Sequence, residues 1–135
     1  MKIIVADTNL LIYALDGESS FNQKSRKIIY SNNYKVMLTN KNITEFCAVL
    51  SKNPHIDYQT INKELKNILL YFDIIFPSIT SIKIFQSLIE KYRIKGNRIF
   101  DMEIVSIMLA NRITNIATFN KNDFQDIEEI SIFEA

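Results

Sequence analysis

The segment from Ile3 to Asn9 constrains the fold more than any other part of this 135-residue chain. Its first four residues, Ile-Ile-Val-Ala, are apolar and mostly β-branched, which favours a buried strand. Asp7, Thr8 and Asn9 follow directly, so the strand ends in polar side chains. Ligands of open parallel α/β sheets bind just beyond the carboxyl ends of the strands. The segment therefore predicts such a sheet, with Asp7 at the edge where chemistry takes place.

The rest of the chain alternates between strand-like and helix-like patterns. Strands are expected at residues 3–6, 34–38, 74–76, 115–118 and 130–133. Apolar residues at helical spacing predict helices at about residues 10–15, 21–29, 43–53, 61–72, 82–92 and 101–112. This alternation is typical of a parallel sheet with helices on both faces. The predicted fold class is α/β, a single domain over residues 1–135 with a central parallel sheet of about four or five strands.

Composition and charge limit the partners and cofactors of the chain. The formal net charge is +1, so any nucleic-acid contact must come from a local basic patch. The single cysteine, Cys47, excludes an internal disulfide and is compatible with a reducing cytoplasm. The single histidine, His55, leaves only oxygen ligands for a metal, as in Mg²⁺ and Mn²⁺ sites. No stretch approaches the ~20 apolar residues of a membrane span, so we expect a soluble cytoplasmic protein with no membrane contact.

Four carboxylates occupy places that a parallel sheet would bring together. Each lies in an element that is expected to start where a parallel strand ends, and the four are Asp7, Glu45, Asp101 and Asp123. Carboxylates ~4 to 5 Å apart repel one another by roughly 3 to 4 kcal/mol per pair, so a divalent cation is expected among them. Bound Mg²⁺ lowers the pKa of a coordinated water and stabilises charge on a phosphoryl oxygen. The four acids therefore predict a site for phosphodiester hydrolysis.

Four segments, taken in their order along the chain, resemble those of the PIN-domain ribonucleases. More narrowly, they resemble the VapC-type toxins of bacterial toxin-antitoxin pairs. They are IVADTNLLIYA at residues 4–14, NITEF at 42–46, DMEIVSIMLAN at 101–111 and IATFNKNDF at 116–124. The resemblance implies an endoribonuclease dependent on Mg²⁺ or Mn²⁺, in which Asp7, Glu45 and Asp101 are catalytic and bind the metal. It also implies an RNA substrate, a homodimer, and an antitoxin protein as the partner of a type II toxin-antitoxin pair.

The last of these segments departs from the family pattern. The family commonly has Asp two residues after the Thr, and that position is Asn120 here. Asp123 matches the acid of the trailing Asp-Phe, and we predict it as the fourth catalytic and metal-binding residue. Asn120 is predicted to support the site, as are Thr8 and Asn9. Whether Asn120 or Asp123 serves as the fourth ligand, and whether one or two metals bind, is left open by the sequence.

Purely structural roles compete with the catalytic ones. Asp7 is suited to cap the helix that follows it, and Asp101 to interact favourably with its helix dipole. Asn42 to Glu45 fits a capping box, in which Glu45 would reach back to the Asn42 amide. A helix-capping role can explain each acid by itself. It does not explain why an acid recurs where successive parallel strands are expected to end. Glu103 lies ~200° around its helix from Asp101 and is expected to point away from the site, towards the surface.

The cations nearest to these acids in sequence are the predicted RNA-phosphate contacts. Three stand in the turn before the last long helix, namely Arg93, Lys95 and Arg98. Lys41 precedes Glu45, and Lys121 precedes Asp123. Contacts of this kind position a nucleic acid without reading its sequence.

Two other functions are compatible with an acid at a strand tip. One is a phosphatase of the haloacid-dehalogenase type or a phospho-acceptor of the receiver type, in which the Asp is a nucleophile. Asn9 speaks against the phosphatase, since that family has a second Asp two residues after the first. The other is a catalytically silent PIN-like module that binds a partner and is weakened at Asn120.

Overall fold

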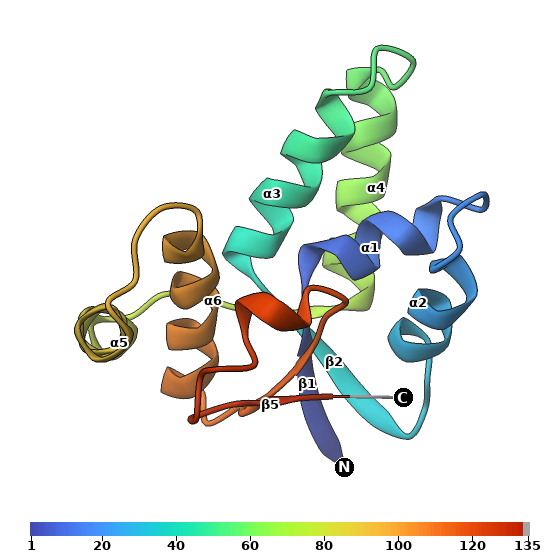
Figure 1. Cartoon of the computed structure of the whole chain (residues 1–135). Coiled ribbons are helices and arrows are strands. Elements are labelled where there is room, and N and C mark those ends of the chain that lie inside the picture. Colours follow the sequence, from blue (N-terminus) through green and yellow to red (C-terminus); the bar gives the residue numbers. More distant parts are fainter. Residues whose placement is uncertain (134–135) are drawn as a thin grey trace.

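A sheet of parallel strands forms the centre of the computed structural model, which describes residues 1–133 (Figure 1). The strands are β1 (Lys2–Ala6), β2 (Tyr34–Thr39), β3 (Asp73–Ile75), β4 (Asn115–Ala117) and β5 (Ser131–Ile132). All neighbours pair in parallel in the order β3-β2-β1-β4-β5. The predicted α/β fold with a parallel sheet of four to five strands is confirmed. Residues 134 and 135, which the domain prediction includes, lie outside the described part.

Helices cover both faces of the sheet. They are α1 (Thr8–Leu15), α2 (Asn22–Ile29), α3 (Asn40–Ser51), α4 (Tyr58–Tyr71), α5 (Ile79–Tyr92) and α6 (Arg98–Ala110), with a short 3₁₀ turn η1 (Lys121–Asp123). Helices α1 to α4 pack on one face, and α5 and α6 pack on the other. Within residues 1–133, no helix has both the length and the apolar character needed to cross a membrane.

The alternation of side chains along β1 divides the core in two. Ile4 and Ala6 pack in the cluster with α1 to α4, whereas Val5 packs in the cluster with α5 and α6. All three side chains are fully buried, as expected for a central strand covered on both faces. Because every strand runs in the same direction, their carboxyl ends share one edge of the sheet. Asp7 lies at this edge beside β4, since its N–H donates to the Ala117 carbonyl at 2.9 Å.

The start of α6 differs from the prediction. The helix begins at Arg98, so Asp101 lies within its first turn and does not open it. The reason is local: Ile99 N–H donates to the Gly96 carbonyl and Phe100 N–H to the Asn97 carbonyl, so helical bonding begins before Asp101. In addition, α6 follows α5 and not a strand, whereas each acid-bearing element was expected to follow a strand. Figure 1 views α5 along its axis while α6 lies in the plane, so the two helices cross.

Candidate active site

Asp7 is fixed by hydrogen bonds to both of its carboxylate oxygens. Oδ1 accepts from the Thr8 N–H at 2.8 Å, and Oδ2 accepts from the Thr118 hydroxyl at 2.8 Å. The residue is 6% exposed, and this burial raises the pKa of Asp7, against the lowering effect of the two hydrogen bonds. The nearby negative charge of Asp123 raises the pKa further. Asp7 is therefore the N-cap of α1, as the structural alternative proposed, and at the same time belongs to an acidic site.

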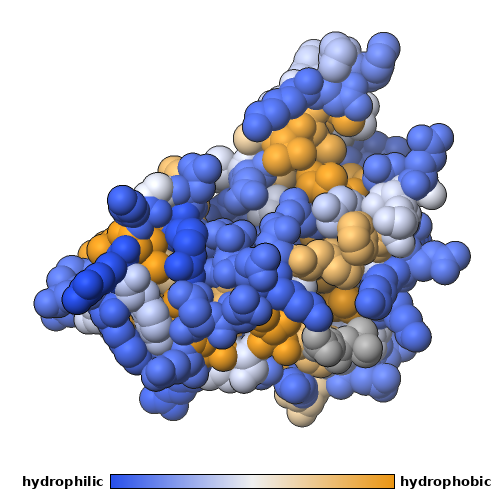
Figure 2. Space-filling model, in the orientation of Figure 1, coloured by the Kyte–Doolittle hydropathy of each residue, from blue (hydrophilic) through white to orange (hydrophobic). Residues whose placement is uncertain are grey.

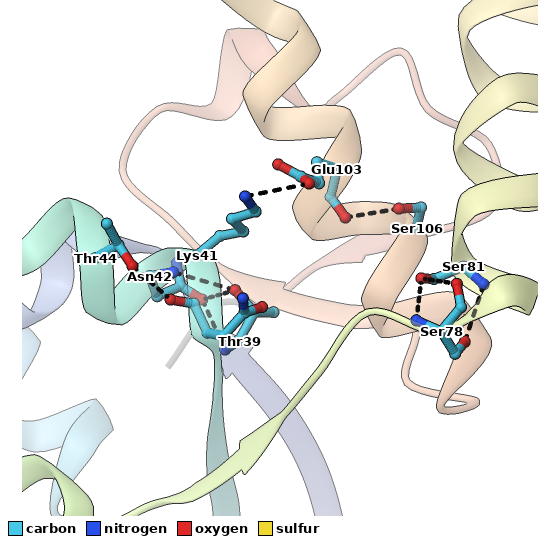
Figure 3. A network of polar contacts seen from close by, with 9 residues as sticks. Thr39, Lys41, Asn42, Thr44, Ser78, Ser81, Glu103 and Ser106 are labelled. Atoms are coloured by element: carbon cyan, nitrogen blue, oxygen red, sulfur yellow. Dashed lines mark hydrogen bonds and ion pairs between the residues drawn. The ribbon is translucent and has the colours of Figure 1, made fainter.

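Thr8 connects the start of α1 to α3. Its Oγ1 accepts a hydrogen bond from Asn42 Nδ2 at 3.1 Å, and its hydroxyl lowers the pKa of the Glu45 carboxyl. Asn42 is fully buried, and its Oδ1 accepts from the Thr39 N–H at 2.9 Å (Figure 3). The capping box of α3 thus consists of Thr39 and Asn42, so the alternative in which Asn42 and Glu45 form the box is wrong. Glu45 is not engaged as a cap.

Glu45 and Asp7 influence one another across the gap between α3 and β1. Glu45 is an exposed residue, but loss of hydration raises the pKa of its carboxyl, and the charge of Asp7 adds to this rise. The Thr8 hydrogen bond and the charge of Lys52 oppose it. The electrostatic effect of Asp7 places Glu45 at the same edge of the sheet.

Asp101 experiences the combined charge of the other three acids. Burial on the first turn of α6 is the largest cause that raises its pKa from 3.8 to about 7. The negative charges of its neighbours contribute next, in the order Asp123, Asp7 and Glu45. Arg98 opposes the rise. All four predicted acids are therefore close enough to interact.

Asp123 is held near Asp101 by Arg98. The guanidinium Nη2 of Arg98, on the first turn of α6, donates to the Asp123 carbonyl at 3.0 Å and to Asp126 Oδ1 at 2.7 Å. Asn120 is exposed, and its N–H donates to Thr118 Oγ1 at 3.0 Å. Asp123 therefore adds charge to the site, while Asn120 contributes a main-chain hydrogen bond to the residue that contacts Asp7.

The donor set fits a hard divalent cation. Four mutually repelling carboxylates need a countercharge, and carboxylate oxygens are the ligands that Mg²⁺ and Mn²⁺ prefer. Among residues 1–133, no three acidic, histidine or cysteine side chains are grouped closely enough to enclose a metal ion by themselves. Mg²⁺ commonly binds through one or two carboxylates and keeps several waters. The residues present are compatible with that open kind of site.

The other predicted residues take varied positions. Lys41 on α3 forms an ion pair with Glu103 on α6 at 3.4 Å (Figure 3). Glu103 is half-buried and faces α3, whereas it was expected to point towards the surface. Asn9 is half-buried on the first turn of α1. Arg93 and Lys95 are exposed in the turn after α5, where Arg93 takes a left-handed conformation with φ 53°. These positions do not test the predicted contacts between the basic side chains and RNA, which stay predictions.

Sequence reasoning did not assign two residues that organise the site. Asn42 orients Thr8, and Thr118 donates to Asp7. A signal for Asn42 was present, because the spacing of Thr39 and Asn42 fits a capping box. Thr118 belongs to the last family-like segment, but its bond to a residue 111 positions away is a tertiary contact that local pattern does not reveal.

Thr118→Val is expected to lower the free energy of unfolding by about 1 to 3 kcal/mol, because a buried carboxylate loses its donor. The Asn120 N–H also loses its acceptor. Urea denaturation at neutral pH measures the change. Thr118→Ser keeps the hydroxyl and serves as the matched control, with a much smaller effect. Equal losses in the two variants would show that methyl packing, not the hydrogen bond, is responsible.

A model of the PIN domain family matches residues 4–130. The match extends over nearly the whole described chain, including the four acids. The chain belongs to the PIN domain family. Comparison with curated proteins gave no match.

Solved structures of toxin-antitoxin proteins share the fold. VapBC2 from Rickettsia felis, bound to a promoter DNA fragment, superposes with a TM-score of 0.73 at 19% identity and covers 97% of each chain. A toxin-antitoxin complex from Klebsiella pneumoniae gives a TM-score of 0.72 at 20% identity over 95% of each chain. VapC20 of Mycobacterium tuberculosis, a toxin that cleaves the sarcin-ricin loop, gives a TM-score of 0.69 at 14% identity. The match covers 89% of this chain and 92% of the VapC20 chain.

Proposed function

We propose that this chain is a Mg²⁺- or Mn²⁺-dependent endoribonuclease and the toxin of a type II toxin-antitoxin pair. The observation that carries the proposal is the convergence of four acids: burial of Asp101, and then repulsion by the other three, raise the pKa of Asp101 to about 7. Membership of the PIN domain family supports nuclease chemistry at this site. The likeness to a toxin that cleaves the sarcin-ricin loop supports an RNA substrate.

In this proposal each acid has a distinct task. Asp7 and Asp101 are the principal metal ligands, Glu45 binds directly or through water, and Asp123 completes the site with Asn120. A bound divalent cation would supply a water of lowered pKa and neutralise charge on the phosphoryl oxygen. Without the cation, Asp101 holds its proton up to about neutral pH.

Hydrogen bonds set the orientation of the acids before a cation or substrate arrives. The Thr118 hydroxyl and the Thr8 N–H fix both oxygens of Asp7, and Asn42 fixes the Thr8 hydroxyl, which lowers the pKa of the Glu45 carboxyl. Each Asp7 oxygen still has a further lone pair with which to ligate a cation. Such prior orientation lowers the cost of reaching the reactive geometry.

The surroundings of Asp7 favour a ligand over a nucleophile. A phospho-acceptor Asp must present one oxygen to a phosphorus atom, but Asp7 is 6% exposed and both oxygens accept hydrogen bonds. The other three acids would also repel an incoming phosphate unless a cation intervened. Phosphate trapped on Asp7 in an acid-labile form would support the nucleophile instead.

An apolar groove supports the proposed antitoxin partner. It has a volume of about 390 Å³ between α1, α2 and α4, and its lining includes Leu11, Ile29, Ile68, Leu70 and Tyr71. Leu70 is 87% exposed, and Figure 2 shows apolar side chains gathered along α3 and α4 and over α5. An antitoxin segment with apolar side chains would cover this groove, in keeping with the VapBC complexes that share the fold.

The remaining predictions concern assembly and location. Exposed Ile79 and Ile82 on α5 are suited to a contact between two copies, which supports the proposed homodimer. A cytoplasmic location stays a prediction.

Cleavage of a labelled single-stranded RNA tests the proposed function. Wild-type protein is expected to cut the RNA with Mn²⁺ and not with EDTA, and to leave DNA of the same sequence intact. Asp7→Asn is expected to be inactive. Glu90→Gln, which removes an exposed acid on α5, is the matched control and stays active. If the wild type cleaves nothing and calorimetry shows no Mn²⁺ binding that Asp7→Ala abolishes, the chain is a silent binding module.

A further inference from the structure

Three aromatic rings form a cluster next to the acidic site. The ring centroids of Phe21 and Phe119 are 4.6 Å apart, and Tyr13 lies 5.1 Å from Phe21 and 5.7 Å from Phe119. Phe21 is 41% exposed, and Tyr13 and Phe119 are half-buried, so the cluster lies at the surface. Phe119 directly follows Thr118, whose hydroxyl donates to Asp7. The cluster is therefore one residue away from the group that fixes the first acid.

Two hollows of the surface meet at Phe119 and Lys121. The smaller, of about 160 Å³, is lined by both residues together with Thr118, Lys24 and apolar side chains of α1, α2 and the C-terminal segment. The larger, of about 380 Å³, extends from Phe119 along the turn to Asp123. The same two side chains thus border the acidic turn on one side and the smaller hollow on the other.

The chemistry of this surface suits an unpaired nucleotide. Proteins that bind single-stranded nucleic acid stack bases on aromatic side chains and place cations along the backbone. Here the exposed ring of Phe21 packs on the half-buried ring of Phe119, and Phe119 lines the same hollow as Lys24, beside a site proposed to cut phosphodiesters. An apolar peptide would bury the rings but would gain nothing from the lysine side chains. A nucleotide uses both the ring faces and the positive charge.

We propose that Tyr13, Phe21 and Phe119, with Lys24 and Lys121, form a subsite for an unpaired nucleotide next to the scissile phosphate. We call this set the stacking subsite. One base stacks on the Phe119 and Phe21 rings, and Lys24 contacts a neighbouring phosphate. The inference rests on the proposed ribonuclease function and names the residues that hold a nucleotide beside its site.

Binding of a fluorescent single-stranded DNA oligonucleotide with Mn²⁺ tests the stacking subsite without cleavage, because DNA is expected to stay intact and the cation offsets the repulsion between the acids and phosphate. Phe119→Leu keeps apolar packing but removes the ring face, and is expected to weaken binding about 5- to 100-fold. Phe119→Tyr keeps the ring and is expected to restore affinity to within about threefold of the wild type. Tyr58→Leu, which removes an exposed ring at the start of α4, is the matched control and leaves affinity unchanged. Each variant is checked for folding by its thermal transition.

Two further measurements separate stacking from a structural role. With Mn²⁺, Phe119→Leu is expected to raise KM for RNA by the same factor while kcat stays near that of the wild type. Lys24→Ala is expected to reduce the slope of log affinity against log salt concentration by about 0.7. A variant that only loosens the fold would lower kcat and leave the salt slope unchanged.

Several outcomes overturn the stacking subsite. They are a wild type that binds no oligonucleotide, a duplex bound as tightly as the single strand, or unchanged affinity in Phe119→Leu. Loss of antitoxin binding by Phe119→Leu with RNA binding unchanged would identify the surface as a protein contact instead. Failure of the proposed function is detected by a separate experiment. It is shown by a wild-type protein that does not cleave RNA with Mn²⁺, and no variant is needed for that result.

Discussion

Asp101→Asn is expected to abolish Mn²⁺-dependent RNA cleavage and to stabilise the metal-free protein at alkaline pH. The pKa of Asp101 in the folded chain is about 7, against an ordinary value of 3.8. Between these values the folded state holds a proton that the unfolded chain has lost, so the free energy of unfolding falls as the pH rises from about 4 to 7. Asn carries no charge, so the variant does not show this fall in the free energy of unfolding.

The expected stabilisation is modest because Asp101 is only partly buried. After solvent screening we expect roughly 1 to 3 kcal/mol at pH 8, or about 3 to 10 °C in Tm, and almost no change at pH 4. Thermal unfolding in EDTA at the two pH values measures this difference. Glu90→Gln is again the control and is expected to change neither Tm nor cleavage. A variant that still cleaves RNA, or that melts no higher than the wild type at pH 8, would contradict the role of Asp101.

Mn²⁺ is expected to bind about tenfold more tightly for each unit of pH from about 5.5 to 7, and to reach a plateau above. Below its pKa of about 7, Asp101 must release a proton before it can ligate the cation. Calorimetric titration at several pH values measures the affinity. Repeating it at pH 6 in two buffers of different ionisation enthalpy counts the released protons, and about one per Mn²⁺ is expected.

The control for this experiment is the Asp101→Asn variant. Its weaker Mn²⁺ affinity should depend far less on pH, because only Asp7 and Glu45 then contribute titrating carboxylates with raised pKa. An affinity of the wild type that stays constant from pH 5.5 to 7 would show that the cation binds without Asp101.

The sheet, and the placement of Asp7 and Glu45 at its edge, could be predicted from the sequence because both depend on short patterns. A strand such as Ile3 to Ala6 is recognisable from its own residues, and parallel strands must place their carboxyl ends on one edge. Asp7 was therefore placed correctly from a single strand and its polar tip. The same holds for Glu45, whose position after β2 puts it at that edge.

The tertiary contacts of the site could not be predicted in this way. The bond from Thr118 to Asp7 joins residues 111 positions apart, and the Arg98 bonds to the turn of Asp123 join α6 to η1. These contacts depend on how helices and turns meet. The capping box of α3 shows a different limit, because two overlapping sequence patterns were available and only packing decided in favour of Thr39 and Asn42.

The place of β1 between β2 and β4 has a consequence for protein synthesis. Asp7 is made well before its main-chain partner Ala117 and its hydroxyl partner Thr118, which lies 111 positions later in the chain. Asp123 follows later still. A growing or truncated chain that lacks residues after 114 therefore has no complete acidic site, although it already carries Asp7, Glu45 and Asp101. For a chain proposed to cut RNA, the ribosome that makes it is exposed to the finished site only after Asp123 has been made and has folded against Asp7.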